Sequence, residues 1–152
     1  MTTPGPGGGG SAGAELPFFV YGTLLPGEPN HDLFLRGRTA GERPAVLPRA
    51  LLYDGPGYPY AIEGHGRVHG TLLVAAPGVY GELLGLLDHL EEFLGPGHPR
   101  NLYERVVCEV ELPGPGDGGP VRAWVYLAAT AVTRSLRTGG VVIPEGRWVT
   151  GR

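Results

Sequence analysis

The sequence predicts an α+β protein, a small mixed β-barrel with one main helix packed against it. Short apolar or alternating runs, which are typical of strands, outnumber helical patterns along the chain. Residues 103–112 and 121–128 flank a Gly/Pro-rich stretch, and this arrangement predicts a β-hairpin and a partly antiparallel sheet. The most convincing helical period, over 79–94, lies between predicted strands.

A single domain is expected from the chain length of 152 residues. Residues 1–15 are rich in glycine and almost free of bulky apolar side chains. We predict a disordered tail there, because such a segment cannot bury enough surface to offset its chain entropy. The folded domain then occupies residues 16–152. Its tail from Ala131 has no clear pattern, although the apolar segment 141–143 is expected to pack.

The first half of the domain is expected to contain three strands and a short helix. Residues 16–21 form an apolar, aromatic run that ends at a small-residue turn, as buried strands often do. A short helix is expected over 30–35, with a proline just before it. Strands are predicted over 45–53 and 67–75, and residues 55–62 between them are expected to form a Gly/Pro-rich loop that runs into a short extended piece.

The helix predicted over 79–94 carries three acids near its end. Its apolar face is formed by Leu83, Leu87, Leu90 and Leu94. At about 100° per residue, Glu91 lies on the flank of this face, Asp88 nearer the polar side, and Glu92 towards solvent. Glu91 is therefore the carboxylate expected to be partly desolvated, and desolvation raises a carboxyl pKa towards the range of a general base. From periodicity alone, a solvated or arginine-paired glutamate is the commoner case.

Composition excludes several classes of partner. The net charge of -3 and the lack of a dense basic patch argue against nucleic acid. No apolar stretch reaches transmembrane length and no signal peptide is evident, so no membrane partner is expected. The single Cys108 cannot form an internal disulfide, which fits a cytoplasmic location. Arginine supplies every basic residue, and this bias is typical of a GC-rich bacterial genome.

Two further patterns are weaker indications of function. His65 and His69 share one face if they lie on a strand, but no further ligands cluster with them, so no metal site is predicted. Cys108 lies on a predicted strand without a basic neighbour, and is interpreted as a small buried side chain rather than a nucleophile.

A turn and a group of polar strand residues suggest how a ligand could be held. Gly22 and Thr23 follow the first strand and expose main-chain N–H groups, which can hold a carboxylate or a carbonyl oxygen. Tyr103 and Arg105 share one strand face, and Tyr126 lies on the strand expected beside it. These three side chains either cap a strand edge or pair with Glu91, or they orient a polar substrate near that carboxylate.

Together these segments resemble the gamma-glutamylcyclotransferase-like superfamily, which includes gamma-glutamylamine cyclotransferases and butirosin-pathway relatives. The matching motifs are Tyr21-Gly22-Thr23-Leu24, Gly57-Tyr58-Pro59, Val68-His69-Gly70-Thr71-Leu72, Leu87-Asp88-His89-Leu90-Glu91 and Tyr103-Glu104-Arg105. The resemblance runs from residue 17 to residue 128 and leaves the C-terminal tail outside it. It implies a small mixed β-barrel with flanking helices, in agreement with the pattern of strands.

The resemblance also implies an enzyme that needs no cofactor and no metal. In the implied reaction the α-amine of a small-molecule gamma-glutamyl substrate attacks its own γ-amide carbonyl and releases 5-oxoproline and a free amine. The residues expected at the site are Glu91 as general acid/base and, in contact with substrate, Tyr21, Gly22, Thr23, Leu24, Tyr103, Arg105 and Tyr126. A non-catalytic module that binds a small acidic ligand is the alternative, although binding alone would not require the acid.

Overall fold

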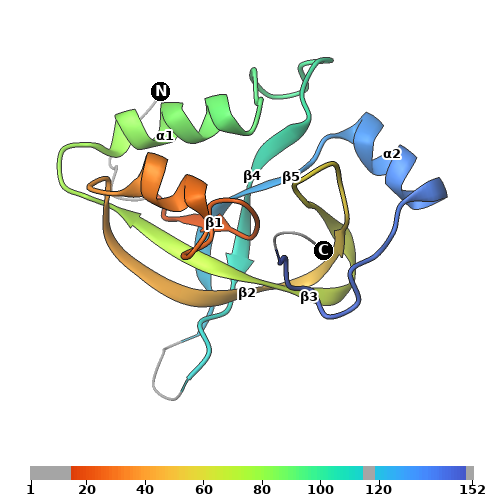
Figure 1. The fold of residues 1–152 in the computed structure, drawn as a ribbon, viewed down its shortest axis with the longest axis horizontal. Helices are drawn as coiled ribbons and strands as arrows, with labels where there is room; N and C mark the ends of the chain where they lie inside the picture. Colours follow the sequence, from red (N-terminus) through yellow and green to blue (C-terminus); the bar gives the residue numbers. More distant parts are fainter. Residues whose placement is uncertain (1–14, 115–118, 150–152) are drawn as a thin grey trace.

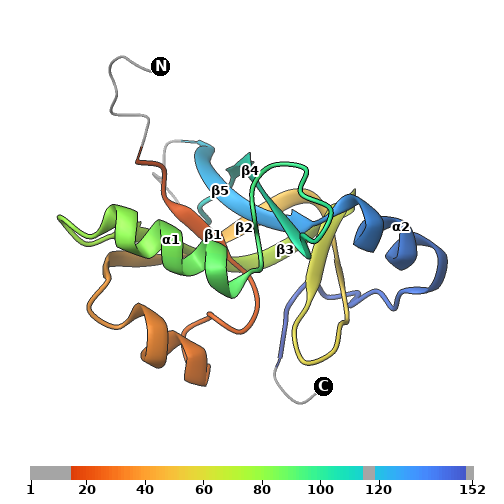
Figure 2. The same cartoon turned by 90° about the horizontal axis from the view of Figure 1, so that it is seen from above.

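The computed structural model describes residues 15–114 and 119–149. Almost all of the segment predicted to be a disordered tail lies outside the described residues. The elements follow in the order β1 (Phe18–Val20), η3 (His31–Leu35, a π-helical turn), β2 (Thr39–Tyr53), β3 (Tyr60–Ala75), α1 (Tyr80–Leu90), β4 (Tyr103–Val110), β5 (Val121–Ala128) and α2 (Thr130–Gly139). Helices α1 and α2 lie at opposite ends of the sheet in both views (Figure 1, Figure 2).

The five strands form one mixed sheet in the order β2-β3-β1-β5-β4. Strand β1 pairs antiparallel with β3 and parallel with β5, and the two outer pairs are antiparallel. Near the edge strands, Val46 and Glu111 exchange two backbone hydrogen bonds of 2.8 Å at an isolated bridge. The predicted α+β fold, its mixed sheet and its β4–β5 hairpin are confirmed. Within the described residues this bridge does not extend into a ladder, so the sheet is not closed into a complete barrel.

Strand β1 lies at the centre of the sheet and is covered on both faces. Phe18, Phe19 and Val20 are 0%, 1% and 6% exposed. Successive side chains of a strand point to opposite faces, so Phe18 and Val20 join one core cluster and Phe19 joins the other. Burial on both faces explains why this strand is a continuous apolar run rather than an alternating one. The strand ends at the turn that carries the predicted ligand-binding residues.

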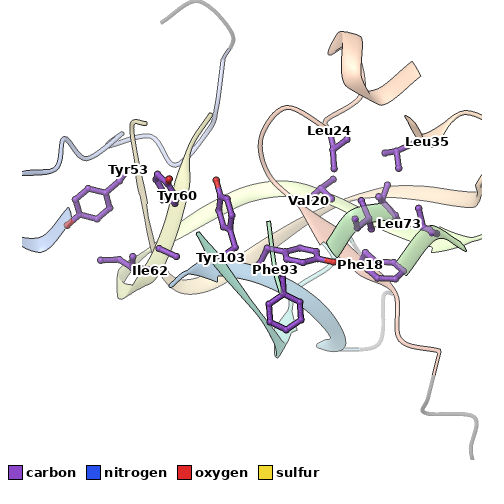
Figure 3. Close-up of a cluster of buried hydrophobic side chains, with 14 residues drawn as sticks. Phe18, Val20, Leu24, Leu35, Tyr53, Tyr60, Ile62, Leu73, Phe93 and Tyr103 are labelled. Carbon is purple, nitrogen blue, oxygen red and sulfur yellow. The ribbon is translucent and has the colours of Figure 1, made fainter. Parts of the chain in front are cut away.

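The core cluster beneath α1 extends along the length of the sheet. Figure 3 shows it as a band from Tyr53 and Tyr60, past Tyr103 and Phe93, to Phe18 near α1. Leu83 and Leu87 anchor α1 in this cluster and are both 0% exposed. The apolar helix face inferred from the leucine spacing is therefore confirmed at its centre.

Helix α1 ends earlier than its sequence pattern predicts. The last helical residue is Leu90, and Glu92 then adopts a φ of +52°, a left-handed conformation that commonly terminates helices. The N–H of Phe93 donates to the carbonyl of Asp88 at 2.9 Å, which satisfies one of the last helical acceptors. Leu94 consequently leaves the apolar face and is 57% exposed, so its predicted place on that face is wrong.

Strand β3 runs through a glycine-rich stretch for which the sequence predicts two separate extended pieces. The structure has one strand of 16 residues there. A Cβ atom on Gly70 would lie 2.2 Å from the carbonyl oxygen of Val20, and one on Gly66 would lie 2.7 Å from that of Ala50. These glycines therefore allow close approach of neighbouring backbone rather than marking a turn.

The chain after β5 packs back onto the sheet. Helix α2 has no buried residue, and the sequence did not predict it. Of the apolar segment 141–143, only Ile143 packs as expected: it is 1% exposed, and its N–H donates to the carbonyl of Leu52 at 2.7 Å, whereas Val141 and Val142 are 64% and 37% exposed. No helix in the described part of the chain is long and apolar enough to cross a membrane.

Candidate active site

A cavity of about 280 Å³ lies where β1 ends, beside the C-terminal end of α1. Strands β4 and β5 and the loop before β3 complete its wall. Every residue that the sequence places at the site lines this cavity, with the exception of Arg105. The structure therefore brings together Tyr21, Gly22, Thr23, Leu24, Glu91, Tyr103 and Tyr126.

The turn after β1 contributes main-chain donors to the cavity. The carbonyl of Gly22 accepts the N–H of Leu25 at 3.0 Å, which closes the turn. Among the described residues, no acceptor is found for the N–H groups of Gly22, Thr23 and Leu24. A Cβ atom on Gly22 would lie 2.7 Å from Cδ of Pro59, so only glycine fits there without displacing the opposite wall. Such unpaired donors favour a ligand with carboxylate or carbonyl oxygens.

Glu91 caps the C-terminal end of α1 and extends from the helix into the cavity wall. Its N–H donates to the carbonyl of Leu87 at 2.9 Å, so a fully buried residue of the core fixes its backbone. Burial raises the pKa of Glu91 from 4.5 to about 7. No other described residue forms a hydrogen bond or an ion pair with its carboxyl group. The carboxyl is therefore ready both to accept and to return a proton near neutral pH.

Of the four tyrosines that line the cavity, three donate their hydroxyl protons to protein acceptors, and the fourth is Tyr58. Tyr21 donates to the carbonyl of Tyr126 at 2.5 Å, and Tyr103 donates to the carbonyl of Pro59 at 2.6 Å. Tyr126 donates to Oδ1 of Asp88 at 2.6 Å. Burial raises the pKa of all three phenols well above the ordinary value, so they keep these protons at neutral pH.

Arg105 lies behind the cavity wall rather than in it. Its Nε donates to Oδ1 of Asp88 at 2.8 Å, and its guanidinium lies 4.3 Å from the ring centroid of Trp124 and 5.2 Å from that of Phe93. The sequence placed Asp88 towards the polar side of α1. Strands β4 and β5 cover that side, so Asp88 is partly buried and accepts hydrogen bonds from both Arg105 and Tyr126.

Two of the weaker candidates, His65 and Cys108, line a second cavity, but the described residues show neither a metal cluster nor an activated thiol there. In the part of the chain that the structure describes, no group of three or more His, Cys, Asp or Glu side chains is arranged to hold a metal ion. His65 and His69 both lie on β3 without such a cluster. Burial and the charge of Glu63 raise the pKa of the Cys108 thiol, which disfavours the nucleophilic thiolate.

Comparison with known proteins places this chain in a family. A family model described as gamma-glutamyl cyclotransferase, AIG2-like, matches residues 18–150. The chain belongs to the AIG2-like gamma-glutamyl cyclotransferase family. The match corrects the narrower extent of the sequence resemblance, which ended at residue 128. In this AIG2-like chain the segment after α2 packs against the sheet, since Trp148 is buried and the carbonyl of Gly146 accepts the N–H of His69 at 2.8 Å.

Two relatives and one solved structure illustrate the likeness of this AIG2-like chain. The gamma-L-glutamyl-butirosin B gamma-glutamyl cyclotransferase of Niallia circulans is 36% identical over 109 residues, which are 72% of this chain and 64% of that protein. The gamma-glutamylaminecyclotransferase of Bos taurus is 34% identical over 123 residues, which are 79% of this chain and 70% of that protein. This chain thus spans slightly less than two thirds of the Niallia protein. An AIG2-like protein of Mus musculus matches with a TM-score of 0.58 and 26% identity, over 76% of this chain and 78% of that one.

Proposed function

We propose that this protein is a gamma-glutamyl cyclotransferase that releases 5-oxoproline and a free amine from a small gamma-glutamyl compound. The α-nitrogen forms a bond to the γ-carbonyl carbon, and the bond from that carbon to the leaving nitrogen breaks. The α-ammonium loses two protons and the leaving nitrogen gains two, so the reaction consumes no water. The observation that carries the proposal is the unpaired, partly buried Glu91 carboxyl at a cavity lined by free main-chain donors.

Glu91 serves as the proton carrier in this proposal. The α-ammonium group must lose a proton before its nitrogen can attack, and a carboxylate with a pKa of about 7 can take that proton at neutral pH. The resulting carboxylic acid then protonates the departing nitrogen. A carboxyl with an ordinary pKa would be a poorer acid in this second step, so burial in the cavity supports both halves of the transfer.

The turn Gly22–Leu24 supplies hydrogen-bond donors, whereas the Glu91 carboxylate supplies an acceptor. The unpaired N–H groups of the turn can bind the α-carboxylate of the glutamyl group or the oxyanion that forms on the γ-carbonyl during attack. The hydroxyl oxygens of Tyr103 and Tyr126 face a ligand as acceptors, because their protons are already donated. A glutamyl chain bound between the N–H donors of the turn and the acceptor oxygens on the opposite wall is bent towards ring closure, which lowers the entropic cost of cyclisation.

The test is release of 5-oxoproline from a panel of gamma-glutamyl amines, gamma-glutamyl dipeptides and a glutamylated aminoglycoside. Turnover by the wild-type protein is expected for at least one gamma-glutamyl amine, and Glu91→Gln should reduce kcat by about 10²–10⁴-fold, the range for loss of a general acid/base. Glu82→Gln is the matched control, because Glu82 lies on the same helix in an exposed ion pair with Arg38. Absence of turnover across the panel, with ligand binding unchanged by Glu91→Gln, would instead support a non-catalytic binding module.

A further inference from the structure

We infer that Asp88 and Arg105 are positioning residues that fix Tyr126 as a hydrogen-bond acceptor for the α-ammonium group of the ligand. The identity of that ligand rests on the proposed function. Asp88 and Arg105 reach the cavity only through Tyr126, which lines the cavity together with Glu91.

The contact with Asp88 determines whether the Tyr126 hydroxyl donates or accepts a hydrogen bond in the cavity. A phenol has one proton, and an ionised carboxylate can only accept. Tyr126 donates to Oδ1 of Asp88 at 2.6 Å, so its proton is directed away from the cavity. Burial and this hydrogen bond raise the pKa of Tyr126, and the phenol stays protonated at neutral pH. Its remaining lone pairs can therefore only accept a hydrogen bond from a ligand.

Arg105 holds Asp88 in the orientation that this arrangement requires. Its Nε donates to the same Oδ1 atom at 2.8 Å, and the two side chains are 17% and 23% exposed. The rings of Trp124 and Phe93 flank the guanidinium at 4.3 and 5.2 Å, which restricts its orientation. Asp88 lies three residues before Glu91, so the same contacts tie the end of α1 to strands β4 and β5.

The groups around Tyr126 match a cationic donor. The Glu91 carboxyl lies on the same cavity, and Tyr103 also donates its proton away, to Pro59. An ammonium group has only protons to offer, and it finds acceptors on this side of the cavity. A carboxylate would meet only lone pairs here and finds its donors at the Gly22–Leu24 turn instead. The substrate's α-ammonium is thereby directed towards Glu91.

The experiment measures binding rather than turnover. In a Glu91→Gln parent, which is not expected to consume its ligand, calorimetry would compare a gamma-glutamyl amide with the glutaric acid monoamide of the same amine. The two ligands differ only in the α-amino group. Adding Asp88→Ala should weaken binding of the gamma-glutamyl amide by about tenfold, the value of a hydrogen bond to a charged group. Binding of the glutaric acid monoamide should not change.

Two further variants separate positioning from general structural support. Asp88→Asn retains an Oδ1 acceptor for Tyr126, so it should retain most of the affinity that Asp88→Ala loses. Glu82→Ala removes an exposed ion pair from the same helix and should alter neither ligand's binding. If Asp88→Ala fails to fold, Tyr126→Phe deletes the acceptor itself and should show the same selective loss.

Equal losses for both ligands, or no loss for either, would overturn the inference. So would Asp88→Asn being as damaging as Asp88→Ala, because charge rather than the acceptor oxygen would then matter. The proposed function is judged separately, by 5-oxoproline release from the wild-type protein. If the variants selectively weaken binding of the gamma-glutamyl amide but the wild-type protein shows no turnover, the proposed enzyme activity is refuted and the role of Tyr126 stands. If the wild-type protein turns over substrate but the variants weaken both ligands equally, the activity stands and the role of Tyr126 is refuted.

Discussion

Replacing Glu91 with glutamine should stabilise the protein above pH 7 and have a smaller effect near pH 4.5. Burial raises the pKa of Glu91 in the folded state to about 7, from 4.5 in the unfolded chain. Between these values the folded protein holds a proton that the unfolded chain has lost, so stability falls as pH rises through this window. One pKa unit corresponds to 1.36 kcal/mol, so a difference of about 2.5 pKa units corresponds to about 3 kcal/mol of stability. This is an upper value, because the Glu91 side chain is partly exposed to solvent. Glutamine carries no charge and avoids this cost.

Urea unfolding at pH 5 and pH 8 would measure the effect. The free energy of unfolding of Glu91→Gln minus that of the wild type should increase by up to about 2.5 kcal/mol between the two pH values, because a small part of the change already occurs below pH 5. Other titrating groups are common to both proteins and cancel in this difference. Glu82→Gln, in an exposed ion pair on the same helix, should show little change. If the free energy of unfolding of Glu91→Gln differs from that of the wild type by the same amount at both pH values, the argument that the Glu91 carboxyl is desolvated in the cavity is refuted.

Three other predictions concern the same cavity and its surroundings. The kcat/KM for a gamma-glutamyl amine should rise with pH through about 7, because only ionised Glu91 accepts the proton; a flat profile from pH 5 to 8 would contradict this role. Glu92 has a φ of +52° and Arg49 a φ of +55°, a left-handed conformation that strains residues with a Cβ atom. Urea unfolding should therefore show a free energy of unfolding about 1 kcal/mol higher for Glu92→Gly, and a similar increase for Arg49→Gly. Gly22→Ala forces a Cβ atom against a proline ring and should lower kcat/KM by about tenfold or more. Gly81→Ala has open space, so unchanged kcat/KM is expected there; equal losses in both alanine variants would contradict the steric explanation.

The sequence predicted the elements that place the cavity because their patterns are local. The apolar run of β1 and the turn after it are adjacent in the chain, and a buried central strand requires such a run. The leucine period of α1 oriented Glu91 correctly towards a desolvated position, since Leu83 and Leu87 are fully buried. The Gly/Pro-rich stretch between the runs 103–112 and 121–128 predicted the β4–β5 hairpin, and the structure confirms their antiparallel pairing.

The missed features depend on contacts between segments distant in the chain. Asp88 was expected on the polar side of α1, because a helical period contains no information about the strands that cover that side. Gly66 resembles a loop residue in sequence, but in β3 it allows close approach of the neighbouring backbone at Ala50. Helix α2 is short and mostly polar, and its apolar residues Val132 and Leu136 are only partly buried against the core, so its helical pattern was overlooked.

The central claim is that the α-amine of the substrate, and not water, attacks the γ-carbonyl. Products formed from a gamma-glutamyl amine in ¹⁸O-water, analysed by mass spectrometry, test it most directly. Cyclisation predicts equal amounts of free amine and 5-oxoproline, no glutamate, and no solvent oxygen in the lactam carbonyl. Release of glutamate carrying one ¹⁸O atom in its γ-carboxylate would show hydrolysis instead, and would contradict the account.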